Sequence, residues 1–453
     1  MRNSTNRVRR AAHLDSISIE NYEKYDKALK LMKALPDDDP RSFLQQAKVH
    51  CAYCVGGYTQ LGSLIDDATL AIPFWNWDAP DGMAAPSIFT DRNSSLYDLK
   101  RDPRHVPNDP FSFYRDTIVN LDYNKNTDVP GSSINIKPKL QIKNNLALIY
   151  KTMISNAKNW REFHGSRYRG GEEPLKGACA GSLERLHNHV HTWVGNPKQP
   201  NREDMGHFYS SGRDPLFYAH HANVDRMWSI WKTLGGKIND PTEYDWLESS
   251  FLFYDENKNL VKVKIKDSVD ERKLGYVYQD FVVIPWINSK PKPSRRVQSK
   301  DDKDKLLAQR PLRKFVDKFP IVLDSGVSTI VKRRKKSRSL KQKEDEEEIL
   351  LIDGIEFDDN IEVKFDVFVN DDDDKVIGPE NTEFAGTFVS LLHAHNHGNN
   401  KKKKKKIVTC LTLGLTDLLE DLKADDDDSI VVTLIPRYGD GVKISGIKIE
   451  FEN

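Results

Sequence analysis

Two histidine-bearing segments between residues 187 and 225 constrain the fold of this 453-residue chain more than any other feature. His187 and His191 are four residues apart, a spacing that places both imidazoles on one face of a helix. Further along, His220 and His221 follow Pro215, a residue favoured in the first turn of a helix. Imidazole suits copper, zinc and iron, and three ring nitrogens can hold an ion with one coordination position open. The pattern therefore predicts two helices that supply histidines to one metal ion.

Length and charge set the broad class of the protein. The chain is long enough for two or three domains. Its net charge of +1 gives no electrostatic reason to expect a nucleic-acid partner. No window approaches the roughly 20 apolar residues of a membrane-spanning helix, so we expect no membrane span. The basic residues 1–10 lack the apolar core of a secretory signal and are too short for a transit peptide, so no complete targeting peptide is predicted.

The first half of the chain has mainly helical patterns. Tyr22, Tyr25, Leu29 and Met32 recur at helical spacing. The proline-bounded aromatic run at residues 73–80 is predicted to lie in the core. Helices are expected over residues 15–62, 142–157, 182–194 and 214–234.

The pattern changes after about residue 240, where short β-type runs begin. Residues 288–315 are rich in Lys, Arg, Ser and Pro and indicate an exposed linker. The rest alternates as strands and predicts a separate β-sandwich or barrel of roughly 130 residues. The expected strands are residues 251–254, 261–265, 276–278, 361–369, 429–436 and 442–451.

Several long motifs of the chain belong together. They are His50-Cys51-Ala52-Tyr53-Cys54, residues 74–78, 208–215 and 217–228, Asp245-Trp246-Leu247, Tyr276-x-Tyr278 and Lys364-Phe365-Asp366-Val367. These motifs resemble plant polyphenol oxidases, the catechol oxidase and tyrosinase family with a two-copper centre. The resemblance implies a multidomain fold, with a mainly α-helical tyrosinase-type catalytic domain followed by a C-terminal β-sandwich or barrel. The implied boundaries are 1–240 for the copper domain, 241–290 for a β segment that completes it, 291–315 for the linker and 316–453 for the C-terminal domain.

The resemblance also implies the chemistry. In this family each copper takes three histidines, and the two ions act together with O2 to oxidise an o-diphenol to an o-quinone. The second copper would be held by His187, His191 and His221, since the family pattern selects the second member of the histidine doublet. Asp225 lies one turn after His221, where it either orients that ligand or is a plain carboxylate on the helix surface.

Three further residues resemble substrate-handling positions of the family. Phe208 matches an aromatic residue that stacks on the phenol ring over the second copper. Asn188 matches an asparagine that, together with a glutamate, holds a water that deprotonates the phenol. Glu184 is the candidate glutamate, although it lies three residues before His187 where the family commonly has four. His189 is expected to point away from the ligands, to the surface.

The first copper is where the sequence departs from the family. His50 matches its first ligand, and Cys54 matches the cysteine of a thioether bridge. The segment that bears the other two histidines is missing, because the chain passes directly from Gly62 to Ser63. The sequence therefore predicts that only the second of the family's two copper sites is intact. A catalytically impaired relative, from a truncated gene, a splice form or an error in the gene model, is the alternative to an o-diphenol oxidase.

Other features leave alternatives open. Cys51-x-x-Cys54 could be a redox or zinc pair, but no second such pair follows, and four cysteines are too few for a disulfide scaffold. His393, His395 and His397 alternate along the chain, as a weak metal site or a polar strand face would. The family resemblance further implies a small phenol and O2 as partners, the C-terminal domain as an intramolecular shield, and the thylakoid lumen of plastids as the location.

Overall fold

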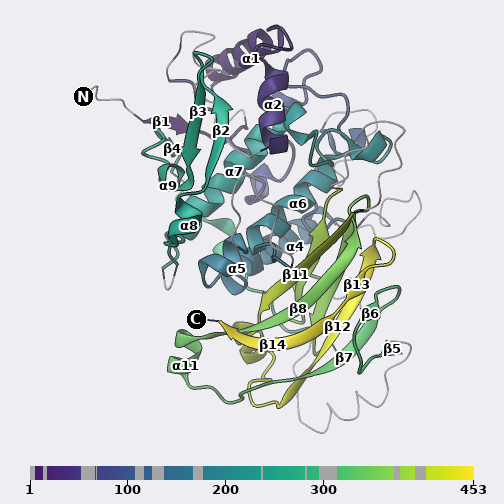
Figure 1. Cartoon of the computed structure of the whole chain (residues 1–453). Helices are drawn as coiled ribbons and strands as arrows, with labels where there is room; N and C mark the ends of the chain where they lie inside the picture. Colours follow the sequence, from purple (N-terminus) through teal and green to yellow (C-terminus); the bar gives the residue numbers. More distant parts are fainter. Residues whose placement is uncertain are drawn as a thin grey trace. The chain divides into compact units, whose positions relative to one another are not determined.

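The computed structural model describes twelve ranges of the chain (Figure 1). These are residues 6–13, 18–52, 67, 69–107, 117–124, 137–166, 177–235, 238–280, 283–294, 314–371, 378–392 and 405–452. The chain divides into two compact units. Unit 1 comprises Met1–Val119, Arg167–Pro174 and Val190–Pro285, and unit 2 comprises Asn120–Ser166, Leu175–His189 and Trp286–Asn453.

Unit 1 is built mainly from helices. Its first helix begins where the Ser18 hydroxyl oxygen accepts the Asn21 N–H, and it buries Tyr25, Leu29 and Met32 as the helical spacing predicts. Its α-helices are α1 (Ile19–Lys33), α2 (Phe43–Ala52), α7 (Leu216–Trp231), α8 (Tyr244–Leu247) and α9 (Ile265–Ser268). Short 3-10 turns are η1 (Pro80–Gly82), η2 (Ser87–Phe89), η3 (Pro103–His105), η7 (Pro200–Arg202), η8 (Ser211–Arg213) and η9 (Pro285–Asn288), the last of which ends in unit 2.

Two small sheets complete unit 1. β2 (Ser250–Tyr254) and β3 (Leu260–Lys264) form an antiparallel hairpin, and β1 (Arg7–Arg9) pairs in parallel with β4 (Tyr276–Tyr278). These strands confirm the β-type runs predicted after residue 240.

The aromatic run at residues 73–80 lies in the core of unit 1, as predicted. Phe74, Trp75 and Trp77 have no exposed surface. The Trp75 backbone N–H donates a hydrogen bond to the carbonyl oxygen of Ala219 on α7, at 2.9 Å. The run therefore fixes one side of the helix that carries the histidine doublet.

Unit 2 combines helices with the C-terminal strands. Its helices are α4 (Pro138–Tyr150), the π-turn η6 (Lys151–Ser155), α5 (Trp160–His164), α11 (Leu340–Asp345) and α12 (Thr416–Asp421), together with the first half of α6 (Ser182–Val194). The two units do not follow the order of the sequence, since residues 120–166 and 175–189 belong to the unit that contains the C-terminal strands.

The strands of unit 2 form two five-stranded sheets, with the order β10-β9-β12-β7-β5 in one and β11-β8-β13-β6 with β14 beside β8 in the other. Apolar side chains of both sheets share one core. Within the described residues this is a sandwich and not a barrel, as expected for one of the two predicted forms. The strands are β5 (Lys314–Phe315), β6 (Ile321–Val322), β7 (Val327–Lys332), β8 (Glu347–Asp358), β9 (Val363–Val369), β10 (Phe384–Ser390), β11 (Lys406–Gly414), β12 (Ser429–Tyr438), β13 (Lys443–Ile444) and β14 (Gly446–Glu452).

Strand β9 carries two charged side chains although it is buried along its whole length. The Lys364 ammonium donates hydrogen bonds to the Asp122 carboxylate and to the Asn124 side-chain oxygen. Asp366 accepts one from the Arg437 guanidinium at 2.5 Å. Each buried charge thus has an opposite charge beside it, which offsets its loss of hydration.

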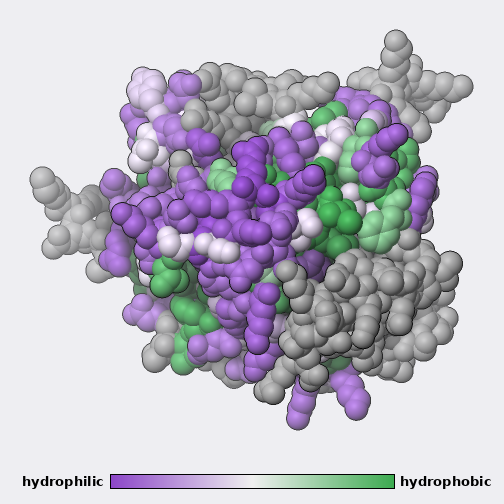
Figure 2. Space-filling model, turned by 90° about the horizontal axis from the view of Figure 1, so that it is seen from below, coloured by the Kyte–Doolittle hydropathy of each residue, from purple (hydrophilic) through white to green (hydrophobic). Residues whose placement is uncertain are grey.

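The surface reflects the high content of charged residues. Figure 2 shows one face of the protein, on which hydrophilic side chains predominate and hydrophobic ones form smaller patches. Exposed large apolar side chains in the strand-rich part include Phe315, Val322, Ile330 and Leu340. No helix among the described residues is both long enough and apolar enough to cross a membrane.

A disulfide joins Cys179, just before α6, to Cys410 on β11, with 4.6 Å between the Cα atoms. The sequence gives no local sign of this pair, because the two cysteines are 231 residues apart. Since a bridge across so long a loop restricts the unfolded chain, we expect the Cys179→Ser/Cys410→Ser variant to unfold about 2–5 kcal/mol more easily. Urea unfolding of the oxidised protein checks this. The reduced wild type is the matched control, and equal midpoints for oxidised and variant protein would contradict the prediction.

Glu347, at the start of β8, predicts a pH dependence of stability. Burial raises the pKa of its carboxyl group to about 7, and the Thr416 N–H donates to it at 3.1 Å. The pKa of Glu347 in the folded protein is above its unfolded value of 4.5, so the protonated carboxyl group adds to the stability of the fold. This stabilisation is complete below about pH 4.5 and is lost as the pH rises through 7. The loss is on the order of 3 kcal/mol. We expect Glu347→Gln to remove this part of the decline. Unfolding midpoints from pH 4 to 9 measure it, with the exposed Glu344→Gln as control; parallel profiles for wild type and Glu347→Gln would exclude it.

Candidate metal centre

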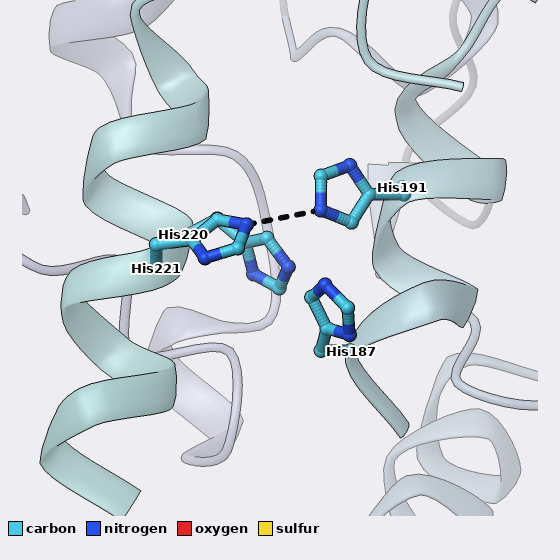
Figure 3. Close-up of side chains that lie close together, drawn as sticks. All are labelled: His187, His191, His220 and His221. Carbon is cyan, nitrogen blue, oxygen red and sulfur yellow. Dashed lines mark hydrogen bonds between the residues drawn. The ribbon is translucent and has the colours of Figure 1, made fainter. Parts of the chain in front are cut away.

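Helices α6 and α7 bring four histidine side chains together (Figure 3). His187 and His191 come from α6, and His220 and His221 come from α7. One ring nitrogen from each lies within 4.8 Å of the others. The Nε2 atoms of His191 and His221 are 3.2 Å apart. This is the convergence of the two segments that the sequence predicts.

The start of α7 is held by a buried ion pair. Asp214, just before the helix, accepts the backbone N–H of Leu216 at 2.8 Å. The same carboxylate receives the Arg101 guanidinium through two bonds, Nε to Oδ2 at 2.8 Å and Nη2 to Oδ1 at 2.5 Å. Such a bidentate pair fixes direction as well as distance. The pair of Arg101 and Asp214 therefore fixes the first turn of α7 and, with it, the position of the histidine doublet.

The two histidines of α6 are oriented by backbone carbonyls. His187 Nδ1 lies 2.8 Å from the carbonyl oxygen of Glu184, and His191 Nδ1 lies 2.9 Å from that of Met205. A carbonyl oxygen only accepts, so each Nδ1 carries the proton and the lone pair of each ring lies on Nε2. Metal-binding histidines commonly have their other ring nitrogen bonded in this way. The donor set fits a copper ion.

The doublet on α7 is not symmetric. The indole N–H of Trp77 donates to Nδ1 of His220 at 3.0 Å. A neutral His220 then has its proton on Nε2 and no lone pair there for a metal. His221 instead points Nε2 at His191 and packs its ring on Phe217, with 4.0 Å between the ring centroids. These contacts support His221 as the third ligand.

Two of the predicted substrate-handling residues, Glu184 and Asn188, lie on α6, and Phe208 lies in the chain between α6 and α7. Asn188 is buried, and Phe208 has 37% of its surface exposed. The Glu184 carboxylate is 54% exposed and lies 3.4 Å from Nδ1 of His187. Water therefore reaches Glu184. The spacing of three residues places the Glu184 carboxylate beside His187.

The structure shows the contacts of the Asp225 carboxylate. Its carboxylate accepts hydrogen bonds from Tyr276 at 2.7 Å, from Tyr278, and from Arg9 at 3.3 Å. The Arg9 guanidinium also lies 3.6 Å from the centre of the Tyr276 ring. The carboxylate therefore ties β1 and β4 to α7.

The structure also corrects the position predicted for His189. Its ring points away from the ligands but is fully buried, and neither ring nitrogen has a hydrogen-bond partner. Helical spacing predicts the direction in which a side chain points. It does not predict whether solvent or other residues surround that side chain. In this case the side chain faces packed residues of unit 2 rather than solvent.

Sequence reasoning missed the polar residues that support the site. Asp78 has no exposed surface and accepts hydrogen bonds from Asn223 and Arg226 of α7, both at 3.0 Å. The aromatic run predicts a buried Trp77, but it does not predict the contact with His220. The one available signal was the acidic residue inside the aromatic run, which needs a partner if it is buried.

The first copper ligands lie outside what the structure describes. The described residues do not include the side chain of His50, Cys54 or the Gly62–Ser63 junction. They also do not include His393, His395, His397 or residues 295–313 of the predicted linker. The assignments for the first copper therefore stay predictions.

Fold and site together define a histidine metalloprotein of the tyrosinase class. The common central domain of tyrosinase matches residues 42–234, the polyphenol oxidase middle domain residues 240–292, and the C-terminal domain of chloroplastic polyphenol oxidase residues 319–451. The polyphenol oxidase of Malus domestica, described as chloroplastic, is 51% identical over 484 residues, covering 98% of this chain and 77% of that protein. Aureusidin synthase of Antirrhinum majus is 46% identical over 487 residues, covering 99% and 82%.

Solved structures agree. Latent apple tyrosinase superposes with a TM-score of 0.86 at 49% identity, covering 99% of this chain and 98% of that one. The chain belongs to the plant polyphenol oxidase family, which confirms the resemblance found in the sequence.

Proposed function

We propose that this protein is a copper-dependent oxidase that converts o-diphenols to o-quinones while O2 is reduced to water. Membership of the polyphenol oxidase family makes it a copper enzyme that acts on phenols with O2. The observation that carries the proposal is the pair of Nε2 atoms of His191 and His221, 3.2 Å apart, with the Nδ1 atoms of His187 and His191 on carbonyl oxygens.

Three side chains would hold the second copper, namely His187, His191 and His221. When bound, copper supplies the electron transfer between the phenol and O2. The protein contributes fixed ring orientations, because the carbonyl oxygens of Glu184 and Met205 lock the proton on Nδ1. Phe208 is the proposed stacking surface for the phenol, with part of its ring open to an incoming substrate.

Asn188 and Glu184 are proposed to prepare a monophenol. A water held between them would take the phenol O–H proton and pass it to the Glu184 carboxylate. The solvent exposure of that carboxylate supports the proposal, because the proton can then leave to bulk water. Among relatives, one from Larrea tridentata that is 48% identical over 483 residues is named (+)-larreatricin hydroxylase.

A one-copper protein is the second candidate. The alignment with the apple relative spans 484 residues and is longer than this chain, so that relative contains residues that this chain lacks. Between His50 and His105 the sequence has no other histidine. A single ion has no partner with which to deliver two electrons to O2, so such a protein would turn over catechols very slowly.

Copper content and turnover, measured together, separate the two candidates. The full chain is loaded with copper, its copper per chain is determined by elemental analysis, and quinone formation from 4-methylcatechol is followed by absorbance. About two ions with turnover support the oxidase; one ion without turnover establishes the one-copper protein. Sequencing transcripts across the Gly62–Ser63 junction is an independent check, because a recovered histidine-bearing segment would restore the first site.

Location and regulation are proposed from the relatives. Those from apple and from Vicia faba are named chloroplastic, which supports a plastid, and within it we propose the thylakoid lumen. The apple structure is named latent, so we propose that residues 316–453 shield the site and that residues 291–315 form the linker. Cleavage in that linker should raise turnover without changing copper content; unchanged turnover would contradict the shield.

A further inference from the structure

Unit 2 contains a small, partly open cavity beside the buried face of α6. It lies among α4 with η6, the first half of α6, and strands β10 and β11. Its volume of about 20 Å³ is enough for one water-sized occupant. The polar side chains that line it are Lys151, Thr152, Asn156, Ser182, Arg185, His189 and Thr387.

Two of these side chains are buried cations. The Lys151 ammonium donates to the backbone oxygen of Asn381 at 2.8 Å and to that of Phe384. An ammonium has three N–H groups, so one is left for the cavity. Arg185 donates to the backbone oxygens of Ala180 and Thr412, at 2.6 and 3.3 Å. Neither cation forms an ion pair with a carboxylate in the described part of the chain, so two positive charges lie against the cavity without direct compensation.

His189 is the third observation. It has no exposed surface, and both ring nitrogens lack a hydrogen-bond partner. A neutral imidazole has one N–H to donate, and leaving it unused when buried costs about 1–3 kcal/mol. The lining therefore offers an N–H of Lys151 and an N–H of His189, together with excess positive charge. A water molecule would satisfy donors but would leave the charge uncompensated.

We propose that this cavity is a binding site for one small monovalent anion of halide size, held by Lys151, Arg185 and His189. A chloride ion accepts N–H groups from several directions, carries the charge that the two cations lack, and is close to a water molecule in size. The site is separate from the copper ligands on the opposite face of α6, and it joins α6 to the β-sandwich through a shared ion.

The affinity for the anion should depend on pH. Burial lowers the pKa of Lys151 to about 7, while Glu383, Glu380 and Asp421 favour its charged form. Arg185 adds positive charge nearby. Burial lowers the pKa of Arg185, and the negative charge of Glu162 on α5 favours its charged form. Because the anion binds the ammonium form, affinity is full below pH 7 and falls as the pH rises above it.

Bromide locates the site directly. Crystals of the full-length, copper-loaded protein grown in sodium bromide should show an anomalous scattering peak between Lys151, Arg185 and His189. The peak should be absent in Lys151→Met and present in Lys143→Met, a variant that removes an exposed lysine from α4. Water alone in the wild-type cavity would overturn the proposal, and this result does not depend on whether any variant folds.

Solution stability gives the second readout. At constant ionic strength and pH 6, replacing gluconate, which is too large for the cavity, with bromide should raise the melting temperature of the wild type and of Lys143→Met by about 2–4 °C. Lys151→Met should show no such increase. Because a halide can also bind copper, and all three proteins keep the same copper ligands, an equal increase in all three would assign the effect to copper and overturn the proposal.

Discussion

Replacing His191 with alanine is expected to remove the copper held between α6 and α7 and to lower its affinity at this site by at least about 100-fold. His191 lies at the centre of the cluster, with Nε2 3.2 Å from that of His221 and Nδ1 on the Met205 carbonyl oxygen. Alanine removes a ligand and leaves that carbonyl without its donor. Copper per chain, measured after dialysis against a weak chelator, and quinone formation from 4-methylcatechol should both fall.

His220→Gln is the matched control for this prediction. His220 sits in the same cluster, but its Nδ1 accepts the Trp77 indole N–H at 3.0 Å. A glutamine side-chain oxygen can accept the same N–H, so the variant should fold and keep its copper. If His220→Gln lost copper as completely as His191→Ala, the assignment of His221 as the third ligand would be wrong.

The parts of the site that depend on residues close together in the sequence could be predicted. The spacing of His187 and His191 fixes their shared face, since helical periodicity depends only on neighbouring residues. The choice between His220 and His221 came from family resemblance alone. Its physical support is the Trp77 indole, which is distant in sequence. The partners of Asp225 could not be predicted for the same reason, because Arg9 and the two tyrosines that bind it come from both ends of unit 1.

The fold was predictable to a similar degree. The strands expected at residues 361–369, 429–436 and 442–451 correspond to β9, to β12 and to β13 with β14, whereas β7, β8, β10 and β11 were not among the expected strands. Alternation does not show which elements pack together. The pairing of Cys179 with Cys410, the burial of His189 and the grouping of α4 with the strands all depend on long-range packing.

The largest effect on stability is expected at the pair of Arg101 and Asp214, whose side chains are 3% and 1% exposed. Asp214→Asn leaves the guanidinium buried without its counter-charge, which should lower the free energy of unfolding by about 3–5 kcal/mol. Because Asp214 also accepts the first N–H of α7, copper affinity should fall as well. Urea unfolding followed by tryptophan fluorescence measures the first effect, and copper titration measures the second.

A double variant tests whether the pair itself is the cause. Arg101→Met/Asp214→Asn removes both charges, so it should recover part of the stability that Asp214→Asn alone loses, since no unpaired charge remains. The exposed pair of Lys266 and Glu248, 2.5 Å apart, is the control, and Lys266→Met should change stability by less than about 1 kcal/mol. Additive losses in the Arg101 and Asp214 variants would show that the two charges do not depend on each other. The start of α7, and the histidines it carries, would then be held by the aromatic run and by Asp78 instead.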